Sequence, residues 1–185
     1  MTALAQLADE LNVNERTLRR AIGEGSLRAT RRSPRTLELS IAERGYIRHA
    51  WALISALRQA LRTEHNVRFA LLFGSVARGT DAPESDVDLL VALRDASLDR
   101  VVDLEAKLSA ATGRRVQIVR LEDAEAQPAF LAELTAVGRV LVDRDGAWTH
   151  LGGRGSRLRK QARSTGQETQ AALAGIDAFL ATRHG

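Results

Sequence analysis

The sequence has 185 residues, of which 44% are hydrophobic and 27% are charged, and its formal net charge is +4 at pH 7. This length allows one good hydrophobic core with a small satellite module, but not two large domains. Cysteine is absent and the four histidines are scattered, which excludes thiolate metal sites and leaves carboxylates as the expected metal ligands. Neither a secretory signal nor a membrane-spanning apolar run is present, so we expect a cytoplasmic protein with no membrane partner.

The N-terminal residues predict two short helices joined by a tight turn. Apolar residues recur at i, i+3, i+4 and i+7 over residues 2–11, which is typical of an amphipathic helix. Asn14 is placed to cap a second helix that begins at Glu15, and Gly25 is placed to end it. The stretch LADELNVNERTLRRAIGEGSL resembles the helix-turn-helix of excisionase-like and MerR-like regulators.

This resemblance implies DNA binding by the outward face of the second helix and by a wing. Residues 27–40 alternate apolar and polar side chains around Ser33-Pro34, which predicts a two-stranded wing with arginines at its tip. Such modules commonly bind paired half-sites as dimers, so a homodimer is also implied. A solvated arginine-rich face and a dimerisation module are the alternatives. The candidate DNA contacts are Arg16, Thr17, Arg19, Arg20 and Arg32.

The remainder of the chain predicts an α/β domain. Apolar positions from Tyr46 to Leu61 indicate one long helix that links the N-terminal module to this domain. Apolar runs rich in valine and leucine are typical of strands buried on both faces. The expected strands are 67–73, 87–93, 115–120 and 140–142, with helices at 98–111 and 126–136. We therefore expect a helix-turn-helix module at 1–43, the α/β domain at 44–148 and a C-terminal helical segment at 149–185.

Four residues between the first two strands carry the chemistry. Gly74-Ser75 ends one buried strand, and Asp86-Val87-Asp88 begins the next after ten intervening residues. A glycine at a strand end lets backbone N–H groups approach a phosphate, and the Ser75 hydroxyl adds a donor. Side chains two apart on a strand share a face, so Asp86 and Asp88 form an oxygen-ligand site for Mg²⁺.

This pattern resembles the GS…DxD signature of the polymerase-β nucleotidyltransferase superfamily, and most of all its minimal nucleotidyltransferases, whose GSxARG and SDxDLLV motifs it nearly repeats. The resemblance spans about 46–148. It implies that Gly74 and Ser75 bind the nucleotide phosphates and that the catalytic residues Asp86 and Asp88 hold magnesium. Arg78 is a candidate phosphate-binding residue, with a solvated helix residue as the alternative.

The sequence departs from the family pattern at the third carboxylate. The family places an Asp on the next strand, where it completes the metal site and helps to deprotonate the acceptor hydroxyl; this chain has Gln117. A neutral amide is a weaker Mg²⁺ ligand and cannot act as a base. Three explanations are open: Glu122, Asp123 or Asp95 substitutes, the two-Asp site works slowly, or the site only binds.

The resemblance implies a Mg²⁺-dependent enzyme that moves NMP, with ATP as the expected substrate, onto a hydroxyl of a protein or RNA. Minimal nucleotidyltransferases often resemble antitoxins paired with a HEPN toxin, and a DNA-binding module suits an autorepressor. One alternative is a degenerate DNA-binding regulator that binds nucleotide or a partner without chemistry. Another is a transferase that modifies small molecules, as the aminoglycoside-modifying enzymes do.

Overall fold

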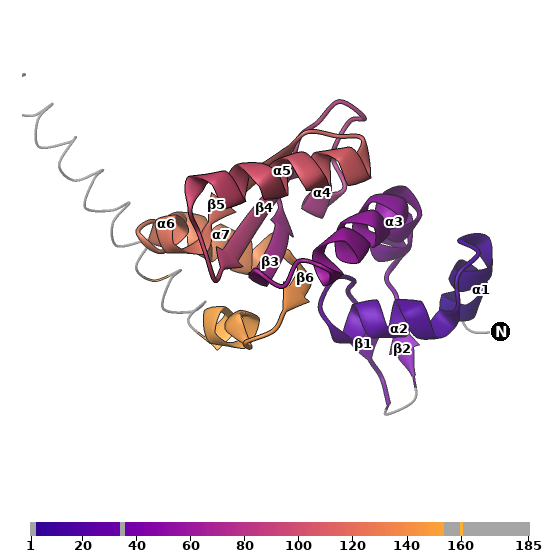
Figure 1. Ribbon diagram of the computed structural model, residues 1–185. Coiled ribbons are helices and arrows are strands. Elements are labelled where there is room, and N and C mark those ends of the chain that lie inside the picture. Colours follow the sequence, from indigo (N-terminus) through magenta and orange to yellow (C-terminus); the bar gives the residue numbers. More distant parts are fainter. Residues whose placement is uncertain (1–2, 34–35, 154–159, 161–185) are drawn as a thin grey trace, which may run out of the picture.

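The computed structural model describes residues 3–33, 36–153 and 160 (Figure 1). Two short helices and a small hairpin come first: α1 (Ala3–Glu10), α2 (Glu15–Gly23), β1 (Thr30–Arg31) and β2 (Leu37–Glu38). Then follow α3 (Ile41–Arg62), β3 (Val67–Phe73), α4 (Gly74–Arg78), β4 (Val87–Leu93), α5 (Leu98–Thr112), β5 (Val116–Arg120), α6 (Leu121–Glu125), α7 (Pro128–Val137) and β6 (Arg139–Asp143). Residues 147–153 are also helical. Within the described residues, no helix is long and apolar enough to cross a membrane.

The N-terminal helices form where the sequence pattern places them. Helix α1 buries Leu4, Leu7 and Ala8, which are its apolar stripe. The Asn14 side chain accepts a hydrogen bond from the Arg16 N–H at 2.8 Å, so it caps α2 as expected. Strands β1 and β2 pair in antiparallel fashion. The predicted turn at 34–35 and the C-terminal segment from residue 154, apart from Lys160, lie outside the described residues.

One four-stranded sheet, in the order β5-β4-β3-β6, organises the rest of the chain. Strand β3 is antiparallel to both β4 and β6, whereas β4 and β5 are parallel. The antiparallel register pairs Phe73, the last residue of β3, with Asp88 near the start of β4. The parallel register pairs Asp88 with Gln117 on β5. The sheet thus brings the end of β3, the start of β4 and the start of β5 together.

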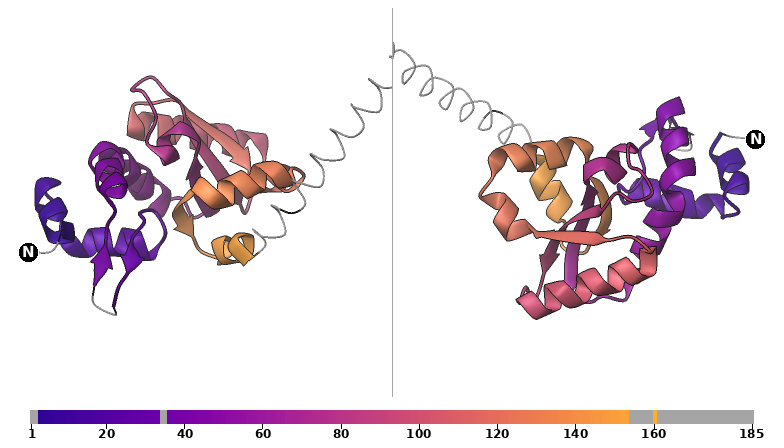
Figure 2. Two further views of the ribbon diagram at one scale, coloured as in Figure 1. Left: turned by 180° about the vertical axis from the view of Figure 1, so that it is seen from behind. Right: turned by 90° about the horizontal axis from the view of Figure 1, so that it is seen from above.

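Helices cover both faces of the sheet (Figure 2). On one face, Ala70 and Leu72 of β3 pack with residues of α3 and α5 in a core that extends into the N-terminal module. On the other face, Phe69 and Leu71 pack with residues of α7 and with Leu151. Side chains alternate between faces along a strand, so β3 is apolar at nearly every position because both faces are buried. The predicted α/β core is therefore confirmed.

A buried ion pair joins the N-terminal module to the sheet. Glu43 in the first turn of α3 and Arg139 at the start of β6 form two hydrogen bonds, at 2.7 and 3.0 Å. The Arg139 Nε donates to the Ala77 carbonyl of α4 at 2.9 Å, and its guanidinium lies 3.3 Å from the centre of the Tyr46 ring. Glu43 also accepts a hydrogen bond from the Arg28 N–H at 2.9 Å. The proposed boundary after residue 43 falls inside α3, next to this pair.

Candidate active site

Gly74 permits the close approach of two backbone segments at the end of β3. It adopts a left-handed conformation with φ of +70°, and a Cβ at this position would collide with the Asp88 carboxylate. Both constraints favour glycine, because a larger residue would be strained and would displace the Asp88 side chain. Ser75 follows in the first turn of α4, which no described side chain caps. The backbone N–H groups of this turn are therefore free to meet an anion.

Asp86 and Asp88 lie next to this turn, at the start of β4. Both side chains are half-buried. Burial raises the pKa of Asp88, and the neighbouring Asp86 charge raises it further, while Arg78 opposes both effects. Side chains two residues apart on a strand point to the same face, so the two carboxylates are neighbours. Such a pair of oxygen ligands is suited to a divalent cation.

Gln117 occupies the position at which the third carboxylate was expected. The parallel register places it beside Asp88, and its side-chain amide donates a hydrogen bond to the Asp86 carboxylate. The Arg115 guanidinium lies 3.8 Å from the same carboxylate but is largely exposed. Gln117 thus contributes a neutral hydrogen-bond donor to the Asp86 carboxylate and no third negative charge.

The three other carboxylates that could replace the missing one lie elsewhere. Glu122 and Asp123 both form ion pairs with Arg120, which pairs with Val91 at the far end of the parallel strands. Asp95 follows the end of β4 and accepts a hydrogen bond from the Ser97 N–H at 3.1 Å. Across the described ranges, no three His, Cys, Asp or Glu side chains form a metal-binding group. The site therefore rests on two carboxylates.

Arg78 lies at the end of α4 and is half exposed. Its guanidinium is 3.5 Å from the Glu133 carboxylate of α7, and its charge lowers the pKa of Asp88. The same side chain is therefore close to the Gly74–Asp88 cluster without forming an ion pair with either aspartate in the described structure. This position suits a contact with a phosphate bound at the α4 turn.

A clamp on the loop between α4 and β4 was not expected from the sequence. Arg114 donates hydrogen bonds to the Ser85 carbonyl at 3.0 Å and to the Asp81 carboxylate at 2.8 Å. His49 of α3 makes a second contact with Asp81, at 2.9 Å. Burial acts to raise the pKa of Asp81, but the hydrogen bonds from Arg114 and His49 outweigh it and hold that pKa below its usual value. The clamp fixes the loop that delivers Asp86.

The candidate DNA contacts do not all face the same way. Arg16, Thr17 and Arg20 are exposed and line one hollow beside α2. Arg19 is half-buried and pairs with Glu15 on its own helix, at 2.5 Å. Arg32 on the hairpin pairs with Glu38. The structure thus gathers three of the five residues.

Comparison with known proteins defines the class of the chain. The family described as "Polymerase beta, Nucleotidyltransferase" matches residues 55–147, and the chain belongs to this family. A curated relative, the protein adenylyltransferase MntA of Thermococcus cleftensis, is 38% identical over 69 residues, which cover 37% of this chain and 70% of the relative. These matches confirm the predicted minimal nucleotidyltransferase and its enzyme class.

A solved structure shows the same fold. A chain in a crystal structure described as a toxin-antitoxin with AMP-PNP is 21% identical to this one, with a TM-score of 0.52. The alignment covers 66% of this chain and 97% of that chain. The likeness therefore extends over nearly the whole of the other chain and leaves about a third of this one outside it.

Proposed function

We propose that the protein is a Mg²⁺-dependent adenylyltransferase that moves AMP from ATP onto a hydroxyl of a partner protein. One observation carries this proposal: Asp86 and Asp88 lie beside the Gly74–Ser75 turn, where a glycine with positive φ lets the backbone pass close to the Asp88 carboxylate. A phosphate site and a pair of carboxylates at one sheet edge are what phosphoryl chemistry on a nucleotide requires.

The residues present fit a magnesium ion. Asp86 and Asp88 present two carboxylates at the start of β4, and oxygen ligands of this kind are those that Mg²⁺ prefers. Asp86, Asp88 and the nucleotide phosphates would hold the ion. When bound, Mg²⁺ would neutralise charge on the triphosphate and on the departing pyrophosphate.

The reaction forms one bond and breaks one. The acceptor hydroxyl oxygen attacks the α-phosphorus, and the bond from that phosphorus to the bridging oxygen of the β-phosphate breaks. Pyrophosphate leaves with the electron pair. The acceptor proton passes to a carboxylate or to solvent, since the Gln117 amide cannot take it. The uncapped α4 turn and Arg78 would hold the phosphates in line.

A HEPN toxin is the acceptor that we propose, with this chain as its antitoxin. The curated relative is called a protein adenylyltransferase, and the solved neighbour comes from a toxin–antitoxin structure. Both names support a protein acceptor over RNA or a small molecule. The alternative, a regulator that binds nucleotide without chemistry, is favoured by one observation, the hydrogen bond from Gln117 to Asp86.

Transfer of label from α-labelled ATP tests the proposal. The full chain is incubated with Mg²⁺ and a candidate HEPN toxin, and label on the toxin is measured. We expect labelling by the wild type and a loss of about 100-fold or more in Asp86→Asn/Asp88→Asn. The matched control is Asp99→Asn/Asp103→Asn, which removes two exposed carboxylates of α5.

Two outcomes would contradict the proposed activity. Equal labelling by the Asp86/Asp88 variant and the wild type would show that these carboxylates do not act in transfer. No labelling by the wild type, with Mg·ATP still bound, would favour the non-catalytic regulator.

DNA binding by α2 is a second function that we propose. The observation that favours it is the exposure of Arg16, Thr17 and Arg20 along one side of that helix. Residues in the N-terminal half of a helix can contact base edges in a major groove, and arginines contact the adjacent phosphates. A homodimer would present two such helices to paired half-sites. The division into a DNA-binding module and a transferase domain belongs to this proposal.

A further inference from the structure

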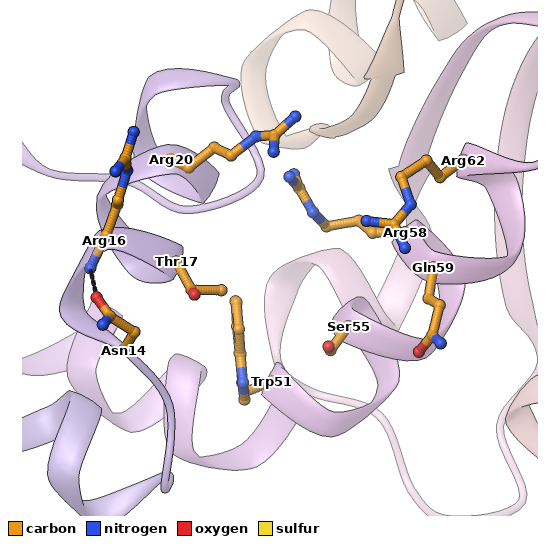
Figure 3. Close-up of a pocket in the computed structure, with 9 residues that line it drawn as sticks. All are labelled: Asn14, Arg16, Thr17, Arg20, Trp51, Ser55, Arg58, Gln59 and Arg62. Atoms are coloured by element: carbon orange, nitrogen blue, oxygen red, sulfur yellow. Dashed lines mark hydrogen bonds between the residues drawn. The ribbon is translucent and has the colours of Figure 1, made fainter.

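Helix α3 supplies a second row of arginines opposite those of α2. A hollow of about 640 Å³ lies between the two helices (Figure 3). One wall carries Arg16, Thr17 and Arg20 at i, i+1 and i+4 of α2, and the other carries Arg58, Gln59 and Arg62 with the same spacing on α3. We call this hollow the arginine groove.

The charge of the groove is mostly uncompensated. Glu24, at one end, pairs with Arg20 at 2.7 Å and also with Arg58. Arg20 and Arg58 extend toward one another across the groove, as Figure 3 shows. Within the described part of the chain, the side chains of Arg16 and Arg62 form no ion pair, and none of the residues that line the groove is acidic. Two arginines are therefore left to meet an external anion.

The lining favours nucleic acid over a protein partner. Apart from the arginines, it consists of neutral hydrogen-bonding side chains and Trp51, which is only 6% exposed. The fully buried core of a protein interface is usually more apolar and depleted of charged residues, whereas four arginines line this groove. Arginines with neutral polar neighbours are typical of surfaces that contact the phosphates and sugars of nucleic acid.

Double-stranded DNA is the nucleic acid that suits this shape. Arg16 and Thr17 in the N-terminal half of α2 are exposed, and the major groove of B-DNA admits an α-helix. The deep, narrow major groove of double-stranded RNA does not. If α2 enters a major groove, the adjacent strand backbone passes along the arginine groove, within reach of Arg58 and Arg62.

We propose that the arginine groove holds one strand of a DNA duplex, with Arg62 of the transferase domain contacting a phosphate beside the one contacted by Arg16, while Arg20 and Arg58 stay paired with Glu24. The inference rests on the proposed DNA binding by α2. It adds that the transferase domain itself forms half of the DNA surface, so the module does not bind alone.

Fluorescence anisotropy with the full chain and a labelled mixed-sequence duplex of about two helical turns tests this. Arg16→Gln and Arg62→Gln should each weaken binding about 5- to 10-fold at low salt and reduce the slope of log K against log salt by about 1. The control, Arg100→Gln, removes an exposed arginine of α5 and should change the affinity less than about twofold. All three side chains are exposed, so thermal unfolding should be unchanged.

The outcomes separate this inference from the functions on which it rests. If Arg16→Gln weakens binding but Arg62→Gln does not, α2 binds DNA and the proposed contact between α3 and DNA is wrong. If neither differs from Arg100→Gln, both the groove and DNA binding by α2 are wrong. Tighter binding of single-stranded RNA, weakened by the same variants, would overturn the choice of DNA. Label transfer by the same preparations reports on the active site independently.

Discussion

The two charged clusters of this molecule are built in opposite ways. Glu43 and Arg139 carry opposite charges, are almost fully buried and find hydrogen-bond partners within the protein. Asp86 and Asp88 carry like charges, are half-buried and leave their mutual repulsion in place. Removal of one partner of the first pair would leave a buried charge alone, whereas the two neighbouring carboxylates of the second pair are suited to an external cation. The comparison therefore separates a structural pair from the proposed functional one.

Removal of Arg139 should have the largest effect, on stability. Arg139→Met leaves the buried Glu43 carboxylate unpaired and deprives the Ala77 carbonyl of its donor, which should lower the free energy of unfolding by about 3–5 kcal/mol. Urea denaturation measures it. Arg48→Met, which breaks an exposed pair with Glu10, is the control and should cost less than about 1 kcal/mol.

The double variant Glu43→Leu/Arg139→Met should lose less stability than the sum of the two single variants, because no charge is left buried alone. A loss for Arg139→Met no larger than that for Arg48→Met would show that the buried pair has no structural role.

An added carboxylate should sharpen the functional side of the comparison. Gln117→Asp places a third negative charge beside Asp88, which should lower the Mg²⁺ concentration for half-maximal label transfer about 10-fold. Gln117→Asn is the control, because it shortens the side chain equally without adding charge. The same Mg²⁺ dependence in both variants would mean that position 117 does not contribute to the metal site.

Neutralising Asp88 should raise the stability of the protein slightly, whereas Arg139→Met should lower it. Its pKa is raised in the fold, so its charge costs stability at pH values above its unfolded pKa of about 4. At pH 7 without Mg²⁺, Asp88→Asn should therefore raise the free energy of unfolding by less than about 1 kcal/mol. Urea denaturation would show this as a higher midpoint concentration. The gain should shrink as the pH falls and the wild-type Asp88 binds its proton.

Asp81→Asn provides the contrast. The pKa of Asp81 is lowered, so its charge stabilises the fold above its unfolded pKa, and that contribution is lost as the pH falls through the folded pKa. The variant should be less stable than the wild type at pH 7. If the Asp88 and Asp81 variants changed the stability at pH 7 in the same direction, the opposite pKa shifts given to the two aspartates could not both be right.

The strands and the four site residues could be predicted because their signals are local. Buried runs such as Val67–Phe73 are apolar at every position except Arg68, and the spacing from Gly74 to Asp88 lies within one strand–turn–strand unit. The position of Gln117 could be predicted for the same reason, because it lies near the start of the next strand, Val116–Arg120. The proposed roles of these residues in binding and catalysis stay predictions.

Pairs that depend on tertiary packing could not be predicted. Glu43 and Arg139 are 96 positions apart, and each alone is typical of an exposed polar residue at the end of an element. The clamp of Arg114 on Asp81 joins residues from two different loops. The arginine groove could not be predicted because it depends on how α2 faces α3. The sequence pattern of each helix shows only its own buried face.

The continuity of α3 has a consequence for how such a chain can be inherited. The helix begins at Ile41 with Ser40 as its cap, passes Glu43 and continues to Arg62, well inside the family-matched region. A gene fragment starting at residue 44 would encode a transferase without the partner of its buried arginine. Loss of the N-terminal module up to residue 43 would therefore leave Arg139 without its partner unless position 139 also changed or another acidic group took the place of Glu43.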